Sequence, residues 1–178
     1  MTDHLDLAFR FAPTDDAGTF TGVAAVHAEP NRHGETIRFG AFKRTLAEHQ
    51  RAGTRVLMLR DHDPRQIVGV WDSIVETDKG LVVTGRFITA TAAGAEAYAL
   101  VKAGAVTGLS IGFRARADAR GSNGGRILTD IELVEISIVG LPSAAKARIK
   151  TIRSQPGRSP KAAAFIAACR KATRSLEK

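Results

Sequence analysis

One short stretch of the chain, VTGLSIGF at residues 106–113, places a single hydroxyl between two glycines. Alternate side chains of a strand point to opposite faces. One face is then mostly apolar and suits a core: Thr107, Leu109, Ile111 and Phe113. Ser110 lies on the other face between Gly108 and Gly112, so we predict a bare surface on which its hydroxyl is open to an approaching peptide. Taken alone, the stretch favours a structural serine in a barrel strand, with its hydroxyl hydrogen-bonded to a neighbour.

A serine hydroxyl becomes a nucleophile only when a base takes its proton, and that base is most often a histidine oriented by a third group. Of the five histidines, His62 is the candidate, because it follows the apolar strand RVLMLR in the polar turn Asp61–Pro64. The flanking residues Asp61 and Asp63 either orient the imidazole or simply form the turn. We expect Pro64 to end the strand.

Glu135 is the candidate for the third group. It lies in an otherwise apolar strand, and strict alternation puts four residues on one face: Ile131, Leu133, Glu135 and Ser137. A buried unpaired carboxylate is costly, so Glu135 needs a partner, for which a histidine or an arginine is the natural choice. Read alone, it is either a member of a catalytic group or part of a structural ion pair. Donors for an oxyanion are not assigned; backbone amides near Gly140 and the side chains of Arg114 and Arg116 are candidates.

The elements that position these residues are mostly strands. The pattern predicts strands at residues 5–12, 19–28, 55–60, 66–77, 80–89, 106–113, 126–139 and 146–152. It predicts helices at residues 41–52 and 91–104, with Gly53 and Gly104 as C-terminal stops and Thr91 as an N-cap. We therefore expect an α+β, mainly β chain, an antiparallel β-barrel with a few external helices.

Charge separates a body from a tail in this chain of 178 residues, whose net charge is +8. Residues 143–178 hold ten lysines and arginines against one acid, which leaves 16 basic and 17 acidic residues before them. The sequence predicts a domain at residues 1–153, followed by a basic linker and C-terminal helix or tail at residues 154–178. Such a tail either meets an acidic partner, protein or nucleic acid, or is a solvated extension.

Other classes of site find little support in the composition. The single cysteine, Cys169, excludes an internal disulfide and a cysteine-based metal site. Metal hydrolysis by the adjacent ligands Asp61, His62 and Asp63 is disfavoured, because three neighbours on a turn seldom face one ion. We expect no cofactor, no transmembrane helix and no signal peptide.

The chain resembles the prohead serine proteases of tailed bacteriophages in the order of His62, Ser110 and Glu135 and in the sequence motifs around them. That family is related in fold to the herpesvirus assemblins. The matching segments are FGAFKRTL, MLRDHDPRQIVG, TAAGAEAYALVKAGAVTGLSIGF and LVEISIVGLP. The resemblance covers residues 19–150 and implies a herpesvirus-protease-like barrel with a shallow surface site. It implies that Ser110 is the nucleophile, His62 the general base and Glu135 the third member.

The resemblance also implies a role. Such enzymes act in the host cytoplasm, inside the immature capsid, and cleave the scaffold or the major capsid protein precursor, and often themselves. A phage or a gene transfer agent fits equally. A homodimer is expected by analogy with the herpesvirus relatives, with no membrane partner and with nucleic acid only at the basic tail. The alternative is a non-catalytic β-barrel module that binds capsid or scaffold through its tail.

Overall fold

A computed structural model of the chain describes residues 3–7, 12–13, 18–31, 33–78, 80–121 and 124–140. Nine strands are described: β1 (Asp3–Leu7), β2 (Ala12–Pro13), β3 (Thr19–Ala25), β4 (Glu35–Ile37), β5 (Leu57–Arg60), β6 (Asp63–Thr77), β7 (Gly80–Phe87), β8 (Gly108–Arg120) and β9 (Arg126–Val139). Two helices are described: α1 (Lys43–Ala52) and α2 (Ala92–Lys102). The predicted strand at residues 146–152 and the tail at residues 154–178 lie outside the described residues.

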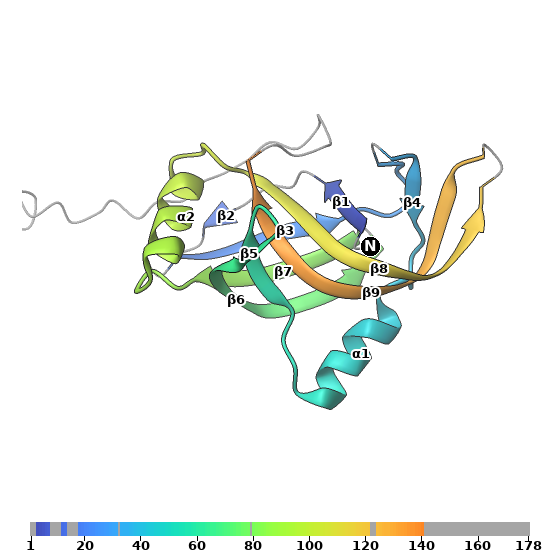
Figure 1. Cartoon of the computed structure of the whole chain (residues 1–178), viewed down its shortest axis with the longest axis horizontal. Helices are drawn as coiled ribbons and strands as arrows, with labels where there is room; N and C mark the ends of the chain where they lie inside the picture. Colours follow the sequence, from blue (N-terminus) through green and yellow to red (C-terminus); the bar gives the residue numbers. More distant parts are fainter. Residues whose placement is uncertain are drawn as a thin grey trace, which may run out of the picture.

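The sheet is mixed and open rather than the expected antiparallel barrel. The strand order is β1-β8-β9-β5-β6-β7-β3-β2, and within the described strands no pairing joins β1 to β2. Both β4 and β5 run parallel to β9. Side-chain alternation indicates the faces of a strand but not the direction of a neighbour far along the chain, which explains the error. The mainly β, α+β class is confirmed (Figure 1).

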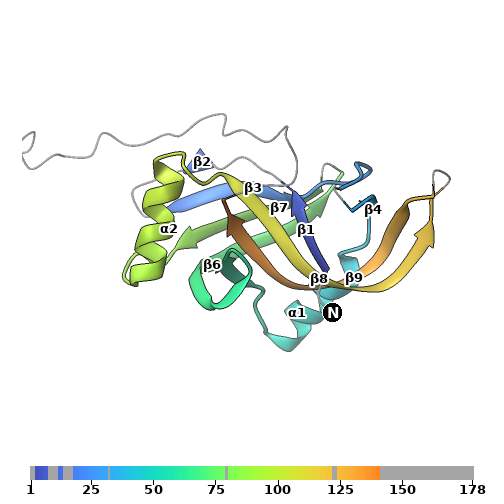
Figure 2. The same cartoon turned by 45° about the horizontal axis from the view of Figure 1, so that its top comes forward.

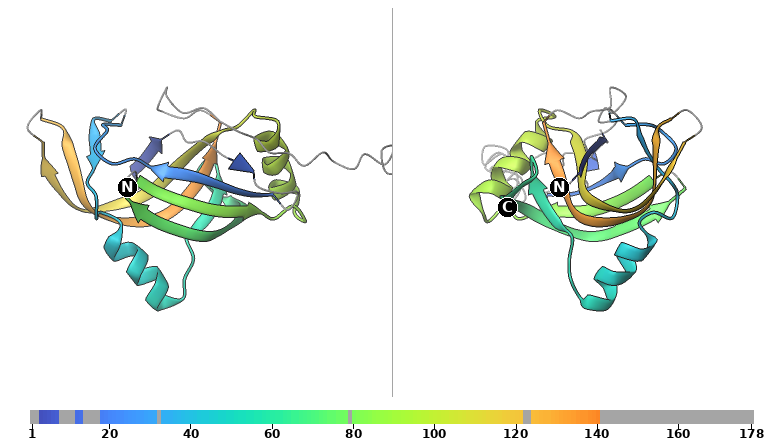
Figure 3. Two further views of the ribbon diagram at one scale, coloured as in Figure 1. Left: turned by 180° about the vertical axis from the view of Figure 1, so that it is seen from behind. Right: turned by 45° about the vertical axis from the view of Figure 1, so that its right-hand side comes forward.

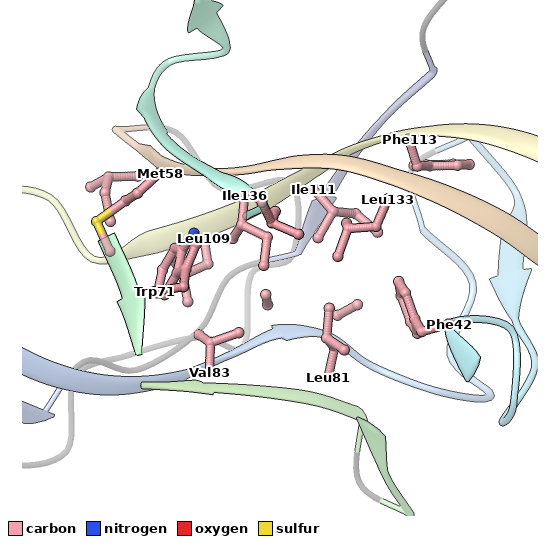
Figure 4. Packing of buried hydrophobic residues seen from close by; sticks show 14 of the residues in the cluster. Phe42, Met58, Trp71, Leu81, Val83, Leu109, Ile111, Phe113, Leu133 and Ile136 are labelled. Atoms are coloured by element: carbon pink, nitrogen blue, oxygen red, sulfur yellow. The ribbon is translucent and has the colours of Figure 1, made fainter. Parts of the chain in front are cut away.

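The sheet curls so that β8 and β9 lie over β3 and β7, and the core fills the space between them (Figures 2 and 3). Figure 4 shows the apolar face of β8 and β9 directed at that of β7. The predicted core face of β8 is confirmed, because Leu109, Ile111 and Phe113 have no exposed surface. Met58 and Trp71 close one end of this core (Figure 4).

The helices begin and end close to the predicted residues. Gly53 ends α1 with a left-handed φ of 64°, which glycine adopts without steric cost. Thr91 is the N-cap of α2, and its hydroxyl accepts a hydrogen bond from the Gly94 N–H at 3.1 Å. Neither helix of the described part of the chain is long and apolar enough to cross a membrane.

Gly94 sets how closely α2 approaches the sheet. A Cβ atom at this position would overlap the carbonyl oxygen of Ile88 and lie 2.9 Å from that of Val68. Since backbone atoms yield poorly, we expect Gly94→Ala to lower the free energy of unfolding by about 1–3 kcal/mol. Urea denaturation measures this loss. Ala99→Gly, at an exposed position of the same helix, gives the intrinsic helix preference for alanine of about 1 kcal/mol. A Gly94→Ala variant that is more stable than wild type contradicts the close approach.

Candidate active site

Ser110 lies in β8 beside two polar residues of β9. In the antiparallel register Ser110 pairs with Ser137, and Gly112 pairs with Glu135. Directly paired residues put their side chains on the same face of the sheet, so Ser110, Ser137 and Glu135 share one surface. The expected open hydroxyl is wrong, because Ser110 has no exposed surface. Gly112 leaves room for the Glu135 carboxylate, since a Cβ atom there would overlap Glu135 Oε1.

His62 lies in a two-residue turn between β5 and β6. Arg60 pairs with Asp63, which leaves Asp61 and His62 as the central residues, with φ values of 49° and 60°. Positive φ at both positions is the property of a type I′ hairpin turn, which normally takes asparagine and glycine. A histidine there stores backbone strain, and such strain persists only where the surroundings enforce it.

Hydrogen bonds from β9 enforce this turn. The Asp61 N–H donates to the Ile138 carbonyl at 3.0 Å, and the His62 N–H donates to Ser137 Oγ at 3.1 Å. Pro64 does not end the strand as predicted, because β6 already begins at Asp63. Proline is tolerated at the start of a strand, where no ladder donor is needed.

Glu135 is buried and has two partners. Its Oε1 lies 2.6 Å from His62 Nδ1, and its Oε2 accepts a hydrogen bond from Ser137 Oγ at 2.6 Å. A carboxylate only accepts, so His62 Nδ1 carries the proton in this pair. The histidine partner that burial of Glu135 demanded is therefore His62. With the proton on Nδ1, Nε2 is the ring nitrogen that carries the lone pair of the neutral imidazole.

A β-bulge brings Glu135 to this face. Gly112 pairs with Glu135 but Phe113 pairs with Leu133, so Val134 is an extra residue in β9. The bulge reverses the alternation, and the prediction that Leu133 shares a face with Glu135 is wrong. Leu133 belongs to the core instead. Without the extra residue, Leu133 and Glu135 would point to the same face. Either Leu133 would then leave the core or Glu135 would enter it.

Helix α1 supports β9 at the bulge. The Leu133 N–H donates to Thr45 Oγ at 3.1 Å, and His49 Nε2 lies 3.1 Å from the Leu133 carbonyl oxygen. The Ile131 N–H donates to the Ala41 carbonyl at 3.1 Å. These contacts satisfy β9 between its parallel pairings with β4 and β5. His49 is thus engaged in holding α1 to the sheet.

The two arginines considered as oxyanion donors are engaged elsewhere. Arg114 lies 3.3 Å from Glu132, and Arg116 lies 2.7 Å from Glu48. Both arginines lie on the part of the β8–β9 hairpin beyond Phe113 and Leu133, which Figure 1 shows extending away from the core, and Glu48 belongs to α1. Both arginines are exposed charges on a strand that leaves the core.

The acidic residues beside His62 have separate partners. Asp61 Oδ1 accepts from the Gly140 N–H at 3.4 Å, whereas Asp63 binds Arg65 at 3.0 Å. The hydrogen bonds from Arg65 hold the pKa of Asp63 below its usual value. Within the described residues no group of three His, Cys, Asp or Glu side chains could hold a metal ion.

Ser137 is the residue of this site that sequence reasoning did not single out as functional. It has no exposed surface and contacts both the turn of His62 and the carboxylate of Glu135. Serine is common in strands, so its presence alone indicates no function. The available signal was a second polar residue two positions from Glu135, on the same face of an apolar strand.

Comparison with known proteins identifies the family. The family model of the caudovirus prohead serine proteases matches residues 7–160. The chain is 34% identical over 151 residues to the prohead protease of Enterobacteria phage HK97, which covers 83% of this chain but 66% of that relative's length. The bacteriophage T4 capsid assembly protease has a similar fold, with a TM-score of 0.60 and 14% identity over 79% of this chain and 95% of that one. The chain belongs to the caudovirus prohead serine protease family.

Proposed function

We propose that the protein is a serine endopeptidase that processes the major capsid protein or scaffold precursor, and itself, during prohead maturation. Membership of the prohead protease family supports this proposal. The structural observation that carries it is the 2.6 Å contact between His62 Nδ1 and Glu135 Oε1, on the face that also holds Ser110. A histidine paired with a buried carboxylate beside a serine is the arrangement that acyl transfer requires.

In the proposed mechanism Ser110 Oγ attacks the carbonyl carbon of the scissile peptide bond while His62 Nε2 takes the hydroxyl proton. Glu135 holds Nδ1–H and stabilises the imidazolium that forms. The imidazolium then gives its proton to the leaving amine, and the acyl group stays on Ser110. Water attacks this ester with His62 again as base, which releases the acid and restores the hydroxyl.

Access to Ser110 is part of the mechanism. Because the side chain has no exposed surface, the face above it must open before a peptide binds. We propose that substrate binding is coupled to this opening, as for other enzymes whose catalytic residues are covered.

Co-expression with the neighbouring capsid gene product tests the proposal. The wild-type protein is expected to truncate that product, and Ser110→Ala to leave it whole. A fluorophosphonate is expected to label Ser110 in the wild type. Truncation that persists with Ser110→Ala would contradict the assignment of the nucleophile.

The burial of Ser110 favours one other function, a non-catalytic module that binds capsid or scaffold. Such a module has no need of an activated serine, so fluorophosphonate labelling discriminates between the two. If Ser110 stays unlabelled while the folded protein binds capsid precursor, the binding module is the better description.

We propose that the enzyme acts inside the immature capsid in the host cytoplasm, as a homodimer. Residues 1–153 form the protease domain, and the basic residues 154–178 direct it to the capsid precursor or contact nucleic acid. Mass spectrometry of wild type and Ser110→Ala tests self-removal of this tail, and equal masses after long incubation argue against it.

A further inference from the structure

We infer that Ser137 is a positioning residue of the active site, which holds the carboxylate of Glu135 and the turn of His62 in one fixed arrangement. The inference rests on the proposed function, because it concerns how the proposed base and its carboxylate partner are aligned. It adds a fourth residue to Ser110, His62 and Glu135, with a role distinct from theirs.

The first observation is that one oxygen atom joins the two other residues. Ser137 Oγ accepts the His62 N–H at 3.1 Å and donates its only proton to Glu135 Oε2 at 2.6 Å. A hydroxyl can do both at once, because it has one proton and two lone pairs. The backbone of the base and the side chain of its partner are thus tied to the same atom.

The second observation is that the two carboxylate oxygens of Glu135 have different partners. Oε2 of Glu135 is held by Ser137, and Oε1 faces His62 Nδ1 at 2.6 Å. The terminal torsion of a glutamate is broad and has no single preferred angle. A fixed hydrogen bond on one oxygen therefore selects the rotation that aims the other oxygen at the imidazole.

The third observation is the strain at His62. Its φ of 60° is unusual for a residue other than glycine, so the turn needs support from its surroundings. The hydrogen bond from the His62 N–H to Ser137 supplies that support at the residue whose ring must point at Ser110. Ser137 also pairs directly with Ser110 across the strands, so the residue that supports the turn lies beside the proposed nucleophile.

Ser137 is not a second nucleophile in this arrangement. Its proton is donated to Glu135 Oε2 and not to the imidazole, so the base is not placed to take it. It acts through Glu135 and His62, which defines a positioning residue. A neutral hydroxyl performs this role without placing a second charge in the buried site.

Three substitutions at one position test the inference in the full-length protein. Ser137→Ala removes both hydrogen bonds. Ser137→Thr and Ser137→Val have the same shape and differ only in whether a hydroxyl is present. Cleavage of a peptide substrate gives kcat and KM for each variant, fluorophosphonate labelling gives the reactivity of Ser110, and thermal unfolding gives Tm.

We expect Ser137→Ala to lower kcat by about 10- to 100-fold with KM changed less than about threefold, since misalignment of catalytic groups acts on the chemical step. Ser137→Thr is expected to retain at least about tenfold more activity than Ser137→Val. The acid limb of the pH profile of kcat/KM is expected to move to lower pH in Ser137→Ala. The imidazolium is less stable when the carboxylate is no longer held against it, so the ring loses its proton at lower pH.

A purely structural role gives a different pattern. Thr91→Ala removes two hydroxyl hydrogen bonds at the N-cap of α2, one accepted from the Gly94 N–H and one donated to the Ile88 carbonyl. It serves as the control, with lowered Tm but unchanged kcat and pH profile. The inference is overturned if Ser137→Ala has kcat within threefold of wild type, if its pH profile is unmoved, or if the threonine and valine variants are equally active. Failure of the proposed function is distinguishable, because it appears as activity that survives Ser110→Ala.

Discussion

Replacing His62 with glutamine is expected to lower kcat by about 10⁴- to 10⁶-fold, as loss of the base does in other serine peptidases. The glutamine side chain can donate a hydrogen bond to Glu135, but it cannot take the proton of Ser110. Hydrolysis of a peptide substrate and the rate of fluorophosphonate labelling both measure the loss. The circular dichroism spectrum of the variant is expected to match that of the wild type.

His27 provides a matched control for this experiment. It is a buried histidine near a carboxylate, with Nε2 lying 3.5 Å from Glu76 Oε1, and it packs against the rings of Phe39 and Phe42. We expect His27→Gln to affect stability while leaving kcat within about threefold of wild type, because it lies outside the proposed catalytic group. Equal activity losses in the two variants would show that loss of a packed histidine side chain, rather than loss of the base, determines activity.

Replacing Gly112 with alanine is expected to lower kcat by about 10²- to 10⁴-fold, although Gly112 takes no part in the chemistry. A Cβ atom there would overlap Glu135 Oε1 and lie 3.0 Å from Glu135 Cδ and Cγ. The side chain of Glu135 can move aside, so the chain still folds. The movement takes the carboxylate away from His62 Nδ1, and steady-state kinetics measures the consequence.

A double-mutant cycle tests whether the loss of activity in Gly112→Ala comes from displacement of the Glu135 side chain. Glu135→Asp shortens the side chain by one methylene group and frees the space beside Gly112. We expect Gly112→Ala to cost much less in the Glu135→Asp background than in the wild type, because the two changes act on one contact. Additive effects of the two substitutions would mean that the methyl group acts on something other than Glu135.

Much of the local structure was predictable because it depends on nearby residues. The caps of α2, the left-handed glycine after α1 and the bounds of β9 follow from patterns a few residues long. The candidates Ser110, His62 and Glu135 were also found from local signals, such as a polar residue in an apolar strand. The structure brings these three residues to one face of the sheet.

The rest of the fold and of the candidate site depends on contacts between distant segments of the chain. The parallel pairing of β5 with β9 and the bulge at Val134 are properties of two strands together, so alternation within one strand could not indicate them. The turn at Asp61 and His62 lacks the glycine or asparagine that normally marks a type I′ turn. Its conformation is imposed by β9, which local propensity does not take into account.

The place of β9 in the chain has a consequence for when the proposed protease can act. Three strands, β4, β5 and β8, pair with β9, and the contact between His62 and Glu135 spans 73 positions. A nascent polypeptide still on the ribosome, without residues 126–139, therefore has neither the carboxylate nor the strand that shapes the turn of its histidine. Under the proposed mechanism, the ability to cut proteins therefore arises only once residues 126–139 have been synthesised and have paired with the earlier strands.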